Sequence, residues 1–180
     1  MAAIPGLTVD DFEKLPDALA LNHELDDGEL VKVSGNTLGH NLLRDLVIEL
    51  LRQFIIPRKL GVIVSEQEFQ FGDNAYAPDI AFIGSPKVHL LNEALRVQRL
   101  VPDLAIEIAS ENDRFNWLAK KAKRYRDSGA SEVWIFSIAL REAWVYSGQR
   151  QVMLDENEQF SSDLIPGFSI RIGDLFDRIQ

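Results

Sequence analysis

The sequence predicts a mixed-sheet α/β domain, and three observations support this fold class. Hydrophobic residues make up 46% of the 180 residues, which is enough for a sizeable core in one compact domain. Apolar residues recur at spacings of three and four over residues 38–54, as in a long helix. The middle of the chain then has the order helix, three strands, helix, strand, which indicates a single α/β domain over residues 1–180.

The first third of the chain predicts a short helix, a hairpin and the long helix. Thr8 followed by Asp11 is typical of a helix start, and a short helix is expected over residues 9–15. An N-terminal hairpin is expected over residues 23–33, because its Asp-Gly turn supplies the positive φ that a tight turn needs. The long helix begins after Thr37 and is expected to end at Pro57.

Strands are predicted through the middle of the chain by β-branched and aromatic residues between turn signals. They are expected over residues 61–65, 68–71 and 78–83, with a turn at 72–74. A weak helical pattern covers residues 92–98. The strongly apolar run over residues 104–108 is of the type that is buried in the middle of a sheet.

The last third of the chain is predicted to form a basic helix that ends at Gly129, followed by a strand meander. The expected meander strands are residues 132–136, 143–146 and 151–154, and a final short helix is expected over 174–179. The complete prediction is a mixed β-sheet flanked by helices, with an N-terminal hairpin and a C-terminal strand meander.

Composition and charge narrow the class of protein. The absence of Cys excludes disulfides and thiolate metal sites. The N-terminus lacks the features of a signal peptide, and no run approaches the ~18 apolar residues that a membrane span requires, so a cytoplasmic protein without membrane contact is expected. The net charge of -9 argues against non-specific coating of nucleic acid, which depends on many contacts between basic residues and phosphates.

One helix-length segment is basic inside this acidic protein. Residues 114–126 carry six basic side chains and no acidic one. A solvated helix face and a strip that steers a nucleic-acid backbone both fit this pattern. The candidates for steering are Arg114, Lys120, Lys123 and Arg124.

Two carboxylates are the first candidates for chemistry. Asp79 lies at the start of an expected strand, and Glu107 interrupts the most apolar strand of the protein. A charge in such a strand is costly unless it is paired or binds a metal. By strand alternation Glu107 shares a face with Ala105 and Ala109, whose small side chains leave room for a ligand.

Helical geometry adds Lys121 to the two carboxylates. At ~100° per residue from Leu118, Lys121 falls about 60° from the centre of the apolar arc of the basic helix, whereas Lys120 and Lys123 fall outside the arc. Oxygen ligands favour Mg²⁺ or Mn²⁺, and a lysine beside such a site stabilises a phosphate or an attacking hydroxide. The set is what metal-assisted hydrolysis of a phosphodiester requires.

The same pattern also fits a structural role. Carboxylates on adjacent strands arise by chance in a chain with 28 acidic residues, and a boundary lysine commonly pairs with a core glutamate. On spacing alone a structural ion pair is favoured. Glu66 and Glu68 are further carboxylates that precede Asp79, and one of them is a weaker candidate for the same site.

A resemblance to a known family favours the catalytic site over the structural ion pair. The segments that carry it are His23–Val31, Gly39–His40, Ala77–Phe82, Val101–Ser110, Lys121–Tyr125, Gly129–Trp134 and Ile165–Phe168. In this order they resemble the Uma-two family of putative restriction endonucleases, and the resemblance covers nearly the whole chain. It implies the restriction-endonuclease-like fold of the PD-(D/E)xK nuclease superfamily.

The resemblance implies a role for four side chains. Asp79 corresponds to the metal-binding aspartate of the superfamily and Glu107 to its second carboxylate. The usual lysine lies two positions after that glutamate, where this chain has Ala109, and the resemblance implies that Lys121 on the next helix replaces it. His40 matches a position where the family usually has histidine.

The first hypothesis is therefore a Mg²⁺- or Mn²⁺-dependent DNA endonuclease. Asp79, Glu107 and the backbone carbonyl of Ile108 would hold the metal, and Lys121 would position the attacking water. A homodimer is expected because a double-strand break needs two sites and the fold leaves a sheet edge available.

Two alternatives remain open. Trp117 and Ser137 stand where the family often has Asp, so a catalytically silent module that binds nucleic acid or protein is the second hypothesis. Hydrolysis of RNA is the third.

Overall fold

The computed structural model describes residues 6–33, 36–109 and 115–179. Its five α-helices are α1 (Val9–Glu13), α2 (Asp17–Ala20), α3 (Leu38–Ile55), α4 (Phe115–Asp127) and α5 (Ile172–Asp177), with one 3-10 turn, η1 (Val88–Leu90). The strands are β1 (His23–Asp26), β2 (Glu29–Lys32), β3 (Gly61–Ser65), β4 (Glu68–Phe71), β5 (Asn74–Tyr76), β6 (Ile80–Gly84), β7 (Val97–Gln98), β8 (Leu104–Ala109), β9 (Glu132–Ser137), β10 (Glu142–Ser147), β11 (Arg150–Leu154), β12 (Gln159–Ser161) and β13 (Ser169–Arg171).

The centre of the molecule is a mixed sheet with the strand order β11-β10-β9-β8-β6-β3. Strands β8 and β9 are parallel and are connected through α4, while the other neighbouring pairs are antiparallel. When the strands of the smaller sheet (β4, β5 and β7) are left aside, the order α3, β3, β6, β8, α4, β9 is the predicted helix, three strands, helix, strand. The predicted fold class is confirmed.

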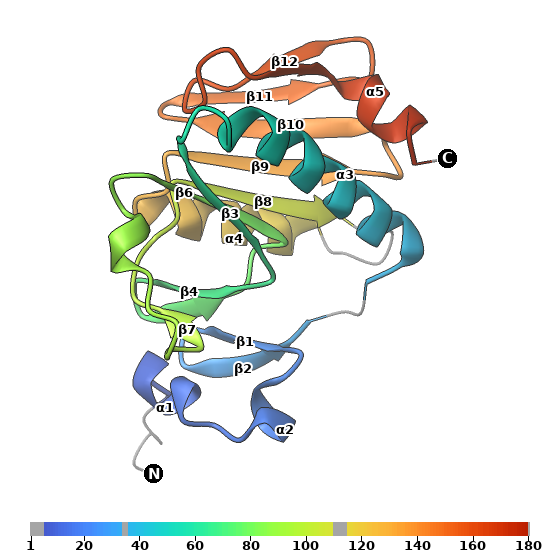
Figure 1. Ribbon diagram of the computed structural model, residues 1–180. Helices are drawn as coiled ribbons and strands as arrows, with labels where there is room; N and C mark the ends of the chain where they lie inside the picture. Colours follow the sequence, from blue (N-terminus) through green and yellow to red (C-terminus); the bar gives the residue numbers. More distant parts are fainter. Residues whose placement is uncertain (1–5, 34–35, 110–114, 180) are drawn as a thin grey trace.

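Each face of this sheet is covered by helices (Figure 1). Leu104, Ile106 and Ile108 point to the face under α3, where the larger core cluster also includes residues of α5. Ala105 points to the opposite face, against Leu118 of α4. Strand alternation therefore places Glu107 on the α4 side, as the sequence predicts.

A second, smaller sheet lies below the large one in Figure 1 and has the order β2-β1-β5-β4-β7. It packs against α4 through aromatic rings, because Tyr125 contacts Phe71 at 4.3 Å and Tyr76 at 5.7 Å between ring centroids. Helix α4 thus lies against residues of both sheets. This position decides which polar groups its side chains meet.

Local sequence signals set the main boundaries. Thr8 and Asp11 form the predicted capping box of α1, and Thr37 caps α3 by accepting the N–H of His40. Gly129 has a φ of 113°, so the turn after α4 uses a conformation that favours glycine. The hairpin of β1 and β2 and the meander of β9, β10 and β11 are confirmed.

One prediction of local structure is wrong. Residues 92–98 are not helical, because Glu13 accepts the N–H groups of Arg96 and Val97 and the Gln98 amide binds the chain at Asn92. The segment instead forms a turn at residues 93–94 that leads into β7, with η1 before it. The expected turn at residues 72–74 is present, and its last residue begins a buried strand that was not predicted, β5. The short final helix is also present, but it begins at Ile172, after the unpredicted pair β12 and β13.

None of the described helices is both long enough and apolar enough to span a membrane.

Glu132 attaches the C-terminal segment to the large sheet. Its carboxylate is 1% exposed and accepts four hydrogen bonds of 2.8 to 2.9 Å. The donors are Trp134 Nε1, Ser162 Oγ and the backbone N–H groups of Asp163 and Leu164. A buried acceptor with four donors is hard to replace, since each unpaired donor carries a desolvation penalty.

We therefore expect Glu132→Gln to lower the free energy of unfolding by about 2 to 4 kcal/mol, because the amide NH₂ group then faces two donors. Urea denaturation measures this change. The matched control Glu29→Gln, on the exposed edge strand β2, should remain within about 0.5 kcal/mol of the parent. Equal destabilisation by the two substitutions would contradict the role of Glu132.

Candidate active site between the two sheets

Asp79 and Glu107 lie next to each other on neighbouring strands. Strands β6 and β8 are antiparallel with Ile80 opposite Ile106, and continuing this register by one residue places Asp79 opposite Glu107. The N–H of Ile108 donates to Asp79 Oδ2 at 2.7 Å, which fixes that carboxylate at the end of β6. The structure thus brings together the two carboxylates that the sequence singles out.

Glu107 is buried beneath α4. Its side chain accepts a hydrogen bond of 2.6 Å from the Tyr125 hydroxyl, and the Lys121 ammonium lies 2.9 Å from the same oxygen, Oε1. Both donors come from successive turns of α4. The carboxylate is therefore held by one neutral and one cationic donor.

Lys121 is only 4% exposed and lies between two carboxylates. Its Nζ is 2.8 Å from Glu24 Oε1 and 2.9 Å from Glu107 Oε1. Leu118, Ala122 and Tyr125 are buried on the same side of α4, so the helical pattern correctly places Lys121 toward the sheet. The ammonium joins β1 of the small sheet to β8 of the large sheet.

Glu24 is the member of the site that sequence reasoning missed. It lies on β1, 97 residues before Lys121, and is 3% exposed. Its Oε1 also accepts the N–H of Ala77, two residues before Asp79, at 3.1 Å. Its Oε2 is buried and has no hydrogen-bond partner within the described residues. The signal in the sequence was the alternation of Glu24 and Asp26 around Leu25, which puts two acids on one face of a hairpin strand.

His40 reaches the same site from α3. Its Nε2 lies 3.1 Å from Asp79 Oδ1, and its side chain is buried near the N-terminus of the helix. Asp79 is thus bound by the ring of His40 on one oxygen and by the backbone of β8 on the other. With a side-chain exposure of 14%, it is the carboxylate of the pair that reaches solvent.

Burial and charge shift the pKa values of the enclosed groups. Burial raises the pKa of Glu107 to about 7, and the nearby acids Asp79 and Glu24 act in the same direction, while Lys121 opposes them. Burial lowers the pKa of Lys121, but Glu107 and Glu24 outweigh it, so the net shift is upward and the ammonium stays charged. Burial also raises the pKa of Tyr125, so its hydroxyl remains a donor.

The donor chemistry fits a hard divalent cation. Glu24 and Glu107 bind the Lys121 ammonium, Asp79 lies beside Glu107, and Glu24 Oε2 is a buried oxygen without a partner among the described residues. Mg²⁺ accepts such oxygen ligands and keeps several waters, so it needs only one or two carboxylates. Among the described residues, however, no group of three or more Asp, Glu or His side chains is arranged to hold a metal ion.

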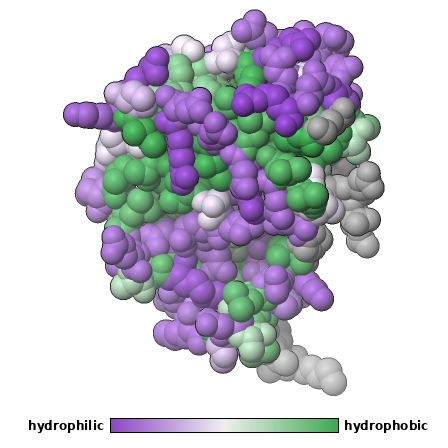
Figure 2. Space-filling view, turned by 45° about the vertical axis from the view of Figure 1, so that its right-hand side comes forward, coloured by the Kyte–Doolittle hydropathy of each residue, from purple (hydrophilic) through white to green (hydrophobic). Residues whose placement is uncertain are grey.

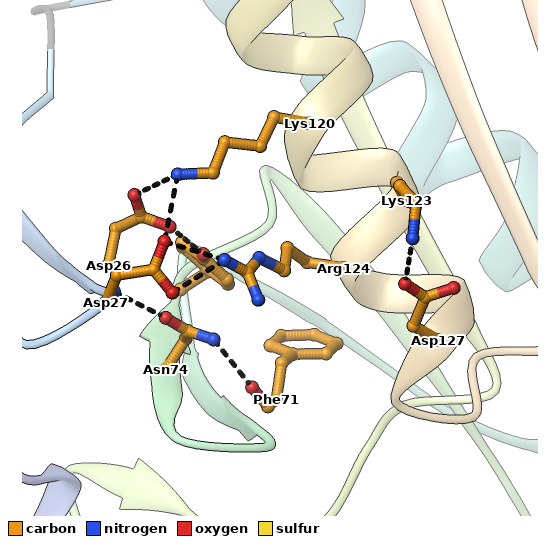
Figure 3. A network of polar contacts seen from close by, with 9 residues as sticks. Asp26, Asp27, Phe71, Asn74, Lys120, Lys123, Arg124 and Asp127 are labelled. Atoms are coloured by element: carbon orange, nitrogen blue, oxygen red, sulfur yellow. Dashed lines mark hydrogen bonds and ion pairs between the residues drawn. The ribbon is translucent and has the colours of Figure 1, made fainter.

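Lys120, Lys123 and Arg124 of α4 are paired with acids of the same chain, whereas steering of a nucleic-acid backbone would favour unpaired basic side chains. Arg124 binds both oxygens of Asp27 at 2.6 and 2.7 Å, and Lys120 pairs with Asp26 and Asp27 (Figure 3). Lys123 pairs with Asp127 one turn later (Figure 3). The acids come from the β1–β2 turn and from the end of α4. Arg114 lies outside the described residues.

The remaining candidates have other side-chain partners. The Glu66 carboxylate binds Arg44 at 2.5 Å, and the Glu68 carboxylate binds Arg96 at 3.1 Å. Trp117, at one of the positions where the family often has Asp, packs edge-on against Tyr76. At the second position, Ser137 accepts the N–H of Leu140 in the β9–β10 turn.

The mixed sheet, the helices on its two faces and the Asp–Glu–Lys cluster define an α/β protein with a nuclease-like fold. The model of the Uma2 family, described as putative restriction endonuclease, matches residues 9–173. The chain therefore belongs to this family. Its fold is similar to the crystal structure of a putative nuclease of the DUF820 group from Anabaena variabilis ATCC 29413, with a TM-score of 0.86 and 20% identity over 97% of this chain and 99% of that chain. A search of curated proteins finds no match.

The raised pKa of Glu107 predicts how stability depends on pH without divalent cations. The folded state holds the Glu107 proton up to about pH 7, whereas the unfolded carboxyl releases it near 4.5. The stabilisation is therefore complete below pH 4.5 and is lost as the pH rises through 7. Over this window we expect the parent to lose on the order of 1 to 3 kcal/mol relative to Glu107→Gln, measured by denaturation in EDTA. Glu68, whose pKa is also raised to about 7, is present in both proteins and cancels. Parallel pH profiles would contradict this prediction.

Proposed function

We propose that the protein is a metal-dependent DNA endonuclease whose active site is the cluster of Asp79, Glu107 and Lys121. The proposal rests on one observation. Two carboxylates on adjacent strands adjoin a buried lysine 2.9 Å from one of them, on a fold shared with a putative nuclease. Membership of a family described as putative restriction endonucleases supports the same reaction class.

Asp79, Glu107 and the backbone carbonyl of Ile108 are the groups that would hold Mg²⁺ or Mn²⁺. A divalent cation there supplies Lewis-acid activation of water and of the phosphoryl oxygens. The chain presets its ligands: the N–H of Ile108 holds Asp79, and the Tyr125 hydroxyl holds Glu107. Preset ligands need little reorganisation when the cation binds.

Lys121 supplies a fixed positive charge beside the reacting phosphate. Its ammonium orients a water and stabilises the negative charge that develops on the phosphoryl oxygens. Glu24 and Glu107 both bind this ammonium, which restricts the rotation of the lysine side chain. His40 acts as a positioning residue, because its Nε2 contacts Asp79 Oδ1.

A catalytically silent binding module is the second candidate function. The pairing of Lys120, Lys123 and Arg124 with acids of the same chain favours it, because less free positive charge is left to attract phosphates. RNA is the alternative substrate of an active site. We further propose that the active form is a homodimer, since a double-strand break requires two cuts.

Metal binding can be measured without knowing the substrate. We expect Mn²⁺ to raise the thermal stability of the parent in a saturable way, by about 2.7 kcal/mol at one hundred times the dissociation constant. Asp79→Asn and Glu107→Gln should abolish this increment. The control Asp45→Asn, which changes an exposed acid on α3, should retain it. Equal increments in all four proteins would contradict a metal site at Asp79 and Glu107.

Turnover distinguishes the two candidate functions. With Mg²⁺ or Mn²⁺ and varied DNA and RNA substrates, we expect cleavage of DNA by the parent and a loss of about a hundredfold or more in Lys121→Met. The control Lys14→Met, at an exposed position directly after α1, should cleave within a few-fold of the parent. Cleavage of RNA alone would replace the substrate in this proposal. Binding of DNA without any turnover would support the silent module.

A further inference from the structure

Glu24 is a charged residue that the fold removes from water. Hydrophilic side chains cover much of the lower part of the molecule, where the small sheet lies (Figure 2). On the neighbouring strand β2, Glu29 and Lys32 are exposed. Glu24 is only 3% exposed, and an ionised carboxylate is costly to bury unless its oxygens have partners. The burial of this carboxylate therefore requires a compensating role.

The hydrogen bonds of Glu24 differ from those of a structural carboxylate. The buried Glu132 uses both of its oxygens, and each accepts two donors. Glu24 uses only Oε1, which accepts from the Lys121 ammonium at 2.8 Å and from the N–H of Ala77 at 3.1 Å. Its Oε2 is buried and has no partner among the described residues. A buried oxygen without a donor lowers stability, so the needs of the fold do not explain this arrangement.

Both contacts of Glu24 Oε1 lead to the candidate active site. Ala77 lies two residues before Asp79, and the Lys121 ammonium lies 2.9 Å from Glu107 Oε1. Glu24 is not assigned as a metal ligand, because no three acidic or histidine side chains of the described chain are arranged to hold an ion. Its influence on a bound cation therefore passes through Lys121.

The charges around Lys121 show what Glu24 adds. If Glu107 were the single carboxylate beside the ammonium, the two opposite charges would largely cancel. Glu107 would then be a weak ligand, because the charge of the ligands sets the affinity for a divalent cation. With Glu24 present, one positive and two negative charges leave a net charge of −1 when both carboxylates are ionised.

We infer that Glu24 is a positioning residue: it neutralises the Lys121 ammonium, so that Glu107 keeps its negative charge for a divalent cation. This inference rests on the proposed function, because it assumes the metal site at Asp79 and Glu107. The hydrogen bonds of Glu24 agree with such a role. Within the described residues, only the N–H of Ala77 competes with the ammonium for its charge.

The affinity for Mn²⁺ tests this role without requiring cleavage. Burial raises the pKa of Glu107 to about 7, so a thermal-denaturation titration at pH 8 measures the dissociation constant with this carboxylate ionised. We expect Glu24→Gln to bind Mn²⁺ at least about tenfold more weakly than the parent. The matched control is Asp26→Asn, because Asp26 is a buried acid of the same strand that pairs with Lys120 (Figure 3). It should bind Mn²⁺ within a few-fold of the parent.

A double variant distinguishes an effect of charge from a loss of structure. Combining Glu24→Gln with Lys121→Met also removes the ammonium that would otherwise pair with Glu107. The two lost charges act on the pKa of Glu107 in opposite directions, so its ionisation changes little. We expect the double variant to bind Mn²⁺ within a few-fold of the parent, whereas Glu24→Gln alone does not. A purely structural Glu24 predicts no such rescue, because the double variant loses the whole link between the sheets.

Three results would overturn the role of Glu24 and leave the nuclease proposal intact. The first is equal Mn²⁺ affinity in Glu24→Gln and the parent, and the second is equal weakening by Asp26→Asn. The third is a double variant that binds Mn²⁺ no better than Glu24→Gln, or about tenfold more weakly than the parent if Glu24→Gln alone does not unfold cooperatively. A parent that does not bind Mn²⁺ would overturn both this role and the proposed metal site.

Discussion

The buried ammonium of Lys121 is the constraint on which the rest of the structure depends. A charged group removed from water requires partners of opposite charge, and its hydrogen-bond donors require acceptors. Glu24 on the small sheet and Glu107 on the large sheet meet this requirement, at 2.8 and 2.9 Å from the ammonium nitrogen. One cation therefore links the two sheets and the helix that lies against both of them.

The same contact sets the geometry of the neighbouring residues. Glu24 also accepts the N–H of Ala77, so the chain that leads into β6 is attached to β1 just before Asp79. Glu107 also accepts the Tyr125 hydroxyl, whose ring packs on Phe71 and Tyr76 of the small sheet. Packing, hydrogen bonding and charge thus favour the same arrangement of the two sheets and α4, as expected of a sequence that specifies one structure. The site is rigid because its members also hold the fold together.

Much of this arrangement could be predicted from the sequence, because it depends on local patterns. The spacing of Leu118, Ala122 and Tyr125 placed Lys121 toward the sheet, and strand alternation placed Glu107 on the face that meets it. Glu24 could not be found in this way, since its partner is 97 residues away and pairing between the hairpin and α4 leaves no periodic signal. The partners of the basic segment could not be predicted for the same reason. Its local charge is positive, but Asp26 and Asp27, which pair with Lys120 and Arg124, lie 93 to 97 residues earlier. The segment 92–98 shows the same limit, because Glu13 determines its conformation from more than 80 residues away.

The ion pairs of α4 differ in how readily a ligand could take the place of the acidic partner. Asp27 is 57% exposed, and exposed pairs contribute little stability because water and salt screen them. A phosphate can therefore replace Asp27 beside Arg124 at a small free-energy cost. Lys121 cannot change partners in this way, because separating it from Glu24 or Glu107 would leave a charge buried without compensation. The helix thus presents exchangeable cations on its exposed side and one fixed cation toward the sheet. An approaching nucleic acid would need to displace only the exposed pairs, and the arrangement of Asp79, Glu107 and Lys121 would remain unchanged as it did so.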